Sequence, residues 1–146
     1  MIAVYPRPDQ LRELLEGPAD QPVVMLNLLR FKDEATEPDE GVSGEEAYER
    51  YAAAMRGIVA SRGGRILWTG RIDSQVIGDG AAEFQVAALV EYPSRKAFAL
   101  IATSQEVAAI GAHRAAGLEG QWLIATTTRA EVMQLPRTRA AACPIR

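Results

Sequence analysis

The first long apolar stretch of the chain, PVVMLNLLRFK at 22–32, has hydrophobic residues on both faces of a period-2 pattern. Side chains of a strand alternate between its two faces. One face would carry Val23, Met25, Asn27, Leu29 and Phe31, and the other Val24, Leu26 and Leu28. Apolar residues on both faces predict a central strand that is covered on both sides.

The clearest helix pattern lies at 44–62. Ser43 and Glu46 form the S-x-x-E signature of a capping box, and Gly63 follows the last turn. Apolar residues recur between them at three- and four-residue steps: Tyr48, Tyr51, Ala52, Met55, Ile58 and Val59. This spacing places them on one side of a helix. A shorter amphipathic helix is predicted at 8–16.

The rest of the pattern predicts three more strands and a second helical region. The strands are expected at 65–78, with a bulge near Gly70, at 84–92 and at 122–129, and a hairpin turn at 78–83. Helical turns are expected from Ser94 to about Ala116. The order β-α-β-β-α-β predicts an α+β protein of the ferredoxin-like kind, with a four-stranded antiparallel sheet and both helices on one face.

Length and composition fit one globular domain. The chain has 146 residues, of which 48% are hydrophobic and 24% charged. We expect an N-terminal extension with a short helix at 1–21, the α+β domain at 22–130, and an irregular C-terminal tail at 131–146.

Charge and cysteine content narrow the function classes. The net charge is −3, which argues against nucleic acid as a partner, and no apolar run approaches the roughly 18 residues of a membrane span. The acidic segment 33–49 is interpreted as a solvated loop and a helix start. The one cysteine, Cys143, forms no disulfide within the chain, which fits a cytoplasmic location.

Cofactor signatures are absent from the sequence. It contains no phosphate-binding loop, no dinucleotide-binding fingerprint and no nucleophile elbow, and a single histidine excludes the usual zinc sites within one chain. We therefore expect no cofactor. An enzyme with this sequence would work mainly with its own side chains.

Three polar residues are candidates for catalysis. His113 is the only side chain whose ordinary pKa lies near 7, so it is the simplest general base, although it also suits the end of a helix. Asn27 interrupts an apolar strand, where it would be either a structural amide or a donor to a ligand oxygen. Arg71 would hold a carboxylate, or pair with Glu91 or Asp73.

Three aromatic residues are candidates for ligand binding. Tyr48 and Tyr51 flank the apolar stripe of the predicted helix at 44–62, so their hydroxyls would reach a space between helix and sheet. Trp68 would stack on an aromatic ligand, or belong to the core.

Several segments together carry a family resemblance. PVVMLNLLRFK, SGEEAYERY, RGGRILWTG, VAALVEYPSRKAF and GAHRAAGL resemble the "domain of unknown function 1330" family over residues 22–128. That family belongs to the dimeric α+β barrel superfamily, whose ferredoxin-like monomers pack sheet against sheet. The resemblance implies this fold and a homodimer.

The resemblance also implies a class of function. Relatives within the superfamily include cofactor-free monooxygenases, isomerases, cyclases and ligand-sensing domains. The leading hypothesis is an enzyme of the monooxygenase, isomerase or cyclase kind. It would act on a small aromatic or cyclic carbonyl compound held between helices and sheet. The alternative is a binding or sensing protein of the same fold without turnover.

Overall fold

The computed structural model describes residues 1–129 and has the element order that the sequence predicts, including the N-terminal helix at 8–16. The helices are α1 (Pro8–Glu16), α2 (Gly44–Ser61), α3 (Arg95–Ala102) and α4 (Gln105–Gly117). The strands are β1 (Val23–Phe31), β2 (Arg65–Arg71), β3 (Val86–Tyr92) and β4 (Leu118–Thr126). The predicted α+β ferredoxin-like class is confirmed.

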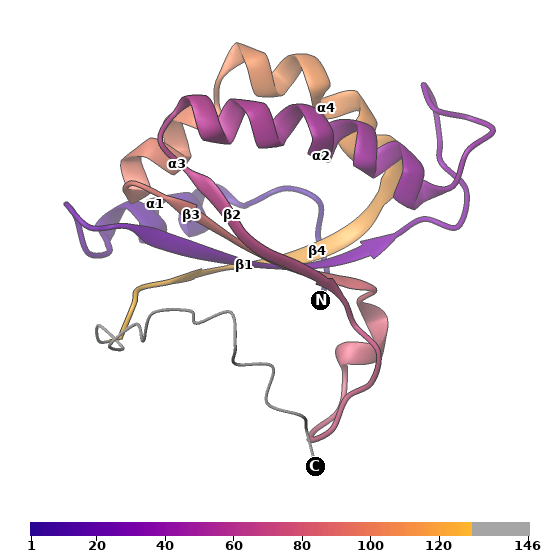
Figure 1. The fold of residues 1–146 in the computed structure, drawn as a ribbon, viewed down its shortest axis with the longest axis horizontal. Coiled ribbons are helices and arrows are strands. Elements are labelled where there is room, and N and C mark those ends of the chain that lie inside the picture. The colour runs from indigo at the N-terminus through magenta and orange to yellow at the C-terminus, as the bar shows by residue number, and fades with distance from the viewer. Residues whose placement is uncertain (130–146) are drawn as a thin grey trace, which may run out of the picture.

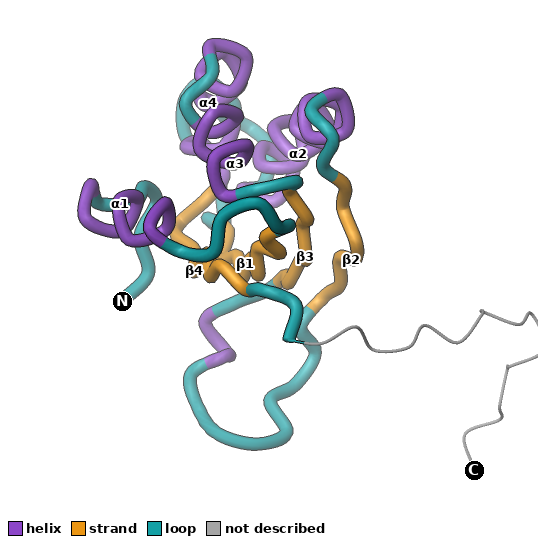
Figure 2. The backbone as a smooth tube through the Cα atoms, turned by 90° about the vertical axis from the view of Figure 1, so that its left-hand side faces the viewer, coloured by secondary structure: helices purple, strands orange, loops and turns teal. Residues whose placement is uncertain are grey.

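The four strands form one antiparallel sheet in the order β2-β3-β1-β4. β1 is therefore central, as its two apolar faces predicted. Helices α2, α3 and α4 lie on the same face of the sheet, while α1 lies beside its β4 edge (Figures 1 and 2). The two crossovers place their helices together, as right-handed connections require.

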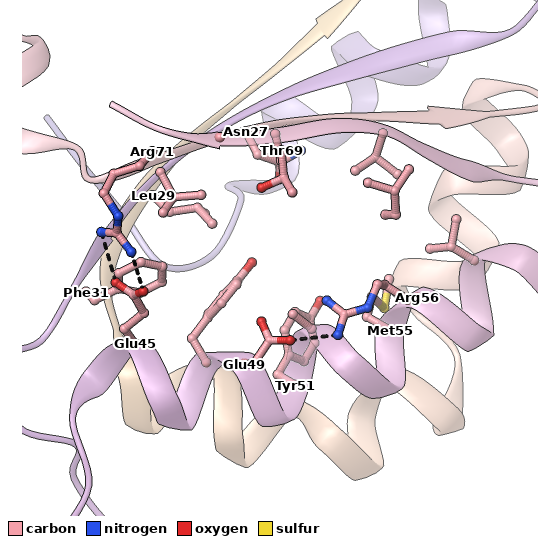
Figure 3. A pocket seen from close by; sticks show the side chains of 18 of the residues that line it. Asn27, Leu29, Phe31, Glu45, Glu49, Tyr51, Met55, Arg56, Thr69 and Arg71 are labelled. Atoms are coloured by element: carbon pink, nitrogen blue, oxygen red, sulfur yellow. Dashed lines mark hydrogen bonds and ion pairs between the residues drawn. The ribbon is translucent and has the colours of Figure 1, made fainter. Parts of the chain in front are cut away.

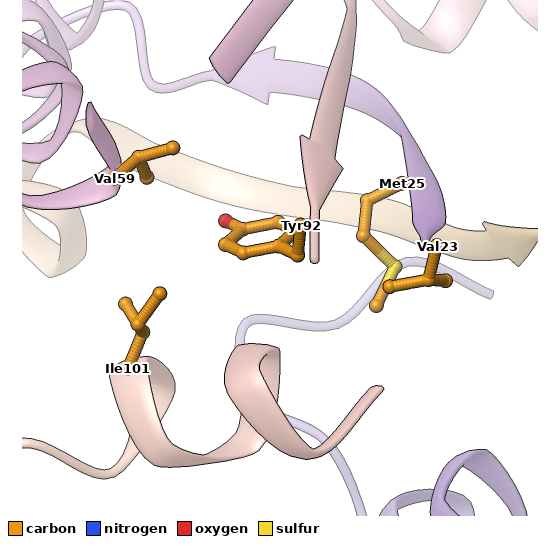
Figure 4. Close-up of a cluster of buried hydrophobic side chains, with 5 residues drawn as sticks. All are labelled: Val23, Met25, Val59, Tyr92 and Ile101. Carbon is orange, nitrogen blue, oxygen red and sulfur yellow. The ribbon is translucent and has the colours of Figure 1, made fainter. Parts of the chain in front are cut away.

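The main core lies between the sheet and these helices. Val23 and Met25 of β1 and Tyr92 of β3 meet Val59 of α2 and Ile101 of α3 (Figure 4). All five are at most 5% exposed. Burial of such side chains contributes roughly 1.5–3 kcal/mol each to folding, so this cluster holds α2 and α3 on the sheet.

Helix α2 begins at a tight junction with the end of α4. The hydroxyl of Ser43 accepts a hydrogen bond from the backbone N–H of Glu46, so the predicted N-cap is present. A Cβ on Gly44 would collide with the backbone of Lys32 and with the carbonyl oxygen of Gly117. The absence of a side chain at Gly44 therefore allows α2 to start against the α4–β4 connection.

Two details of the β2–β3 region differ from the prediction. β2 ends at Arg71 and β3 begins at Val86, so a long loop with a short 3₁₀ turn at Ala81–Glu83 replaces the expected hairpin. The register shift in β2 falls between Ile66 and Trp68 rather than near Gly70. The turn residues at 78–80 therefore lie within the loop and do not directly connect two paired strands.

The face of the sheet opposite the helices carries two apolar rows. The pairing aligns Trp68, Leu89, Leu26 and Ile124 in one row across the four strands. The next row holds Ala87, Leu28 and Trp122. Within residues 1–129 no α-helix covers this face (Figure 2), and Phe84 of the loop before β3 packs against Trp122 with ring centroids 4.9 Å apart. We call it the open face.

The N-terminal segment packs on the β4 edge. Ala3 pairs with Gln121 in an isolated bridge, and the guanidinium of Arg114 donates to the carbonyl oxygen of Val4. The division of the chain at residues 21 and 22 stays a prediction. The predicted tail at 131–146 lies outside the described residues.

Candidate functional site

A cavity of about 490 Å³ lies between α2 and the sheet. Its floor comes from β1, β2 and β3, which are drawn uppermost in Figure 3, and its roof from α2, which is drawn below them. A volume of this size suits a small organic ligand, since ligand pockets span roughly 300–1,000 Å³. Because β1 lies inside the sheet, the side chains of its helix-facing side, Asn27, Leu29 and Phe31, form part of the cavity floor.

Asn27 is the polar residue in the middle of the cavity floor. It pairs with Ala88 across the sheet, and both line the cavity. The side-chain amide donates one hydrogen bond to the carbonyl oxygen of Met25, at 3.2 Å. This local bond leaves the amide's second N–H and its oxygen for a ligand, because a primary amide offers two donors and one acceptor.

A row of aromatic rings lines the cavity, with Phe31 on β1 and Tyr48 and Tyr51 on α2. Phe31 and Tyr48 have ring centroids 5.3 Å apart, and Tyr48 and Tyr51 are 5.4 Å apart. All three residues line the cavity. Such a wall offers a planar ring system edge-to-face or stacked contacts.

Burial keeps the tyrosine hydroxyls neutral. It raises the pKa of Tyr48 and Tyr92 well above the ordinary value, and it raises the pKa of Tyr51 as well. Since all three line the cavity, their hydroxyls remain protonated hydrogen-bond donors near pH 7. Together with Asn27 they give the cavity neutral donors and acceptors.

Two ion pairs lie among the residues that line the cavity, on its solvent-exposed side. The guanidinium of Arg71 on β2 donates to both carboxylate oxygens of Glu45 on α2, at 2.8 and 3.3 Å. Arg56 donates to one oxygen of Glu49 within α2, at 2.6 Å. These side chains are 42–61% exposed, so they mark the mouth of the cavity (Figure 3).

Arg71 has a different partner from those considered from the sequence. The expected alternatives were Glu91 and Asp73, but Glu91 pairs with Arg65, and the strongest partner of Arg71 is Glu45. The hydrogen bonds from Arg71 to Glu45 raise the pKa of the guanidinium. The sequence did not predict this pair, because Glu45 and Arg71 lie 26 positions apart on different elements, α2 and β2.

Glu49 is a site residue that the sequence analysis missed. It lines the cavity and uses one carboxylate oxygen for Arg56, while the other points toward the cavity (Figure 3). Its spacing of three residues from Ala52, a member of the apolar stripe, offered a signal, because residues three apart lie on the same side of a helix. The dense acidic run around it made a solvated face the simpler interpretation.

His113 does not lie at the cavity. Its Nδ1 is 2.7 Å from a carboxylate oxygen of Asp39, whose other oxygen accepts a hydrogen bond from Arg50. Asp39 is 2% exposed in its side chain, so it is buried rather than solvated as the acidic segment was expected to be. His113 is therefore not among the residues that line this cavity, and it holds the loop before α2 through Asp39. Its expected role as a general base stays a prediction.

Trp68 also lies away from the cavity. The register shift between Ile66 and Trp68 turns the indole to the open face, where Trp68 pairs with Leu89. Arg71 pairs with Val86 and lines the cavity on the helix side. Trp68 is 53% exposed. Trp68 therefore does not line this cavity, and its expected contact with a ligand stays a prediction.

The described residues show no metal centre and no membrane helix. Within residues 1–129, no group of three or more His, Cys, Asp and Glu side chains is placed to hold a metal ion. None of the helices described there combines the length and apolar character needed to cross a bilayer.

Solved structures with the same fold include one close relative in shape. The RPA0582 protein of Rhodopseudomonas palustris, described as a protein of unknown function, is 27% identical with a TM-score of 0.77, over 86% of this chain and 96% of that one. A methylated form of RPA0582 gives 26% identity and a TM-score of 0.79, over 89% and 97% of the two chains.

A more distant structure is SnoaB, a cofactor-independent oxygenase from Streptomyces nogalater. It is 10% identical with a TM-score of 0.51, over 78% of this chain and 99% of that one, and this likeness shows the fold alone. No protein with a curated description matches the chain. Residues 40–128 match the domain of unknown function (DUF1330), and the chain belongs to this family.

Proposed function

We propose that the protein is an enzyme that enolises a small aromatic or cyclic carbonyl compound in the cavity between α2 and the sheet. The observation that carries the proposal is the convergence of neutral hydrogen-bonding groups in one apolar cavity. Asn27 supplies an amide on the floor, and Tyr48 and Tyr51 supply hydroxyls on the roof. A binding site without chemistry would need fewer convergent polar groups.

Enolisation is the step that isomerases, cyclases and cofactor-free monooxygenases of this kind would share. The free carboxylate oxygen of Glu49 takes a proton from the carbon next to the ligand's carbonyl group. The C–H bond breaks, its electron pair forms the C=C bond of an enolate, and the charge moves to the oxygen. Neutral hydrogen-bond donors placed at this oxygen stabilise such an oxyanion.

Glu49 replaces His113 as the base in this proposal. His113 is bound to Asp39 outside the cavity, whereas Glu49 lines the cavity with one oxygen directed into it. Asn27 and Tyr51 then hold the oxyanion, while Arg71 stays paired with Glu45 at the mouth. SnoaB, described as a cofactor-independent oxygenase, shares the fold alone, so the proposal rests on the cavity.

The test is hydrogen–deuterium exchange at the ring carbons next to the carbonyl group of 2-tetralone, followed by NMR in D₂O. The protein is expected to accelerate this exchange, and Glu49→Gln to lower the accelerated rate about 100-fold or more. Glu46→Gln is the matched control, since it removes the same charge one turn earlier on α2, and Glu46 does not line this cavity. Binding of 2-tetralone without accelerated exchange would favour the ligand-binding alternative and contradict the enzyme.

We also propose that the open face pairs with a second copy of the chain. Its apolar rows include Trp68, Trp122 and Ile124, which are 53%, 39% and 43% exposed. An exposed apolar surface of this kind is typical of an interface. A symmetric dimer would cover the same face in both protomers and leave the two cavities on the outer side.

A further inference from the structure

The cavity has no unpaired positive charge among its lining residues. Within the described part of the chain, the charged side chains that line it are two arginines, Arg56 and Arg71, and two glutamates, Glu45 and Glu49. Each arginine donates hydrogen bonds to one of the glutamates. A ligand carboxylate entering this mouth therefore meets two carboxylates already in place.

The pair at Arg71 is the more complete of the two. Both carboxylate oxygens of Glu45 accept hydrogen bonds from the guanidinium, so the paired donors that would grip a ligand carboxylate are already used. Such a two-point contact is the geometry in which arginine recognises carboxylates. The two residues come from α2 and β2, on opposite sides of the mouth (Figure 3).

The interior of the cavity favours an uncharged ligand over a carboxylate. An amide, a threonine hydroxyl and tyrosine hydroxyls can exchange hydrogen bonds with a carbonyl or hydroxyl group, but none carries the charge that would compensate a buried carboxylate. Asn27 and Thr69 provide such groups on the floor, and Tyr51 on the roof.

We propose that Glu45 is a specificity-determining residue: by occupying Arg71, it makes the cavity select uncharged planar ring compounds with a carbonyl or hydroxyl group and reject their carboxylate analogues. This inference rests on the cavity of the proposed function and names its substrate class. It assigns Glu45 no part in proton transfer. Removal of the Glu45 charge leaves Arg71 able to bind a carboxylate.

The test uses two probes of the same shape, 2-acetylnaphthalene and 2-naphthoate, and isothermal titration calorimetry. The wild-type protein is expected to bind the ketone at least about tenfold more tightly than the carboxylate. Glu45→Gln is expected to raise the affinity for 2-naphthoate at least about tenfold and to leave the affinity for the ketone within about twofold. The control Glu46→Gln changes the net charge equally but leaves Arg71 paired, so both affinities should stay near the wild-type values.

Two further variants test whether Arg71 carries the effect. Asp73 is the other carboxylate whose charge acts on Arg71, so Glu45→Gln with Asp73→Asn removes a substitute partner. This double variant should bind 2-naphthoate at least as well as Glu45→Gln alone. Glu45→Gln with Arg71→Gln should lose the gain completely.

The outcomes separate this proposal from the enzymatic one. Equal wild-type affinity for both probes would overturn the specificity role of Glu45. The specificity role would also be overturned if neither Glu45→Gln alone nor Glu45→Gln with Asp73→Asn gained affinity for 2-naphthoate. The same gain in affinity in Glu46→Gln would overturn it as well. Failure of both probes to bind would contradict the cavity as a ligand site. Charge selection without accelerated exchange of 2-tetralone would support Glu45 and contradict only the enzyme.

Discussion

Asn27 is a half-buried amide whose one described hydrogen bond stays within its own strand. Asn27→Ala is therefore expected to weaken binding of 2-tetralone by roughly 1–3 kcal/mol, the range for loss of a hydrogen-bond partner in a buried site. The thermal midpoint should change little. Calorimetric titration and thermal unfolding together check this, and unchanged affinity with a clear loss of stability would make Asn27 purely structural.

Asp39 joins the loop after β1 to two helices, through Arg50 on α2 and His113 on α4. The hydrogen bond with His113, supported by Arg50, holds the pKa of Asp39 below its usual value of 3.8. A carboxyl whose pKa is lower in the folded than in the unfolded state stabilises the fold above the unfolded pKa. That stabilisation is lost as the pH falls through the folded pKa.

Asp39→Asn should accordingly lower the thermal midpoint by several degrees between about pH 5 and 7. The difference from the wild-type protein should begin to shrink below about pH 4, where the unfolded carboxyl takes up a proton, and should keep shrinking until the pH has passed the lower pKa of folded Asp39. Thermal unfolding of both proteins at a series of pH values measures this difference in thermal midpoint. A difference that stays constant down to about pH 3 would contradict the ionic role of Asp39.

Four of the six candidate side chains named from the sequence lie at one cavity, on β1, α2 and β2. Asn27, Tyr48, Tyr51 and Arg71 all line it, and their roles in binding and catalysis stay predictions. The contact of His113 with Asp39 was not predicted, because Asp39 lies 74 positions earlier in a loop whose acidic composition suggested solvation. Periodicity carries no information on such long-range pairs.

At the scale of the elements, strand boundaries were less predictable than helix starts. Ser43 marked the start of α2 because a cap acts locally, through a bond to a residue three positions away. The end of β2 depends instead on where β3 continues to pair with it, and pairing stops at Arg71 and Val86. The register shift after Ile66 is likewise a property of the strand pair.

Two glycines of α2 should respond in opposite ways to alanine. Gly57 lies in the exposed part of the helix, and a Cβ at this position would meet no atom within 4 Å, so Gly57→Ala should stabilise the protein by roughly 0.5–1 kcal/mol. Gly44→Ala should destabilise it by roughly 1–3 kcal/mol or more, because the methyl group would overlap the Lys32 backbone. Urea unfolding measures both, and equal effects would contradict the close packing at the start of α2.

At the scale of the whole molecule, the open face predicts a homodimer. Sedimentation at micromolar concentration should give about twice the chain mass of 15.8 kDa. Trp68→Glu places a charge on the row that Trp68 shares with Leu89 and Leu26, so it should shift the protein toward the monomer. Leu100→Glu on α3 is the matched control, since Leu100 is 58% exposed on the helical side. A wild-type monomer, or equal dissociation by both variants, would contradict this interface.

The central claim is that ligands bind between α2 and the sheet rather than on the open face. Titration of the ¹⁵N-labelled protein with 2-tetralone, followed in one ¹H–¹⁵N spectrum, tests it directly. The side-chain amide signals of Asn27 and the backbone signal of Tyr51 should shift with ligand, while the indole N–H signal of Trp122 stays in place. A shift of the Trp122 signal with those of Asn27 and Tyr51 unmoved would contradict the claim.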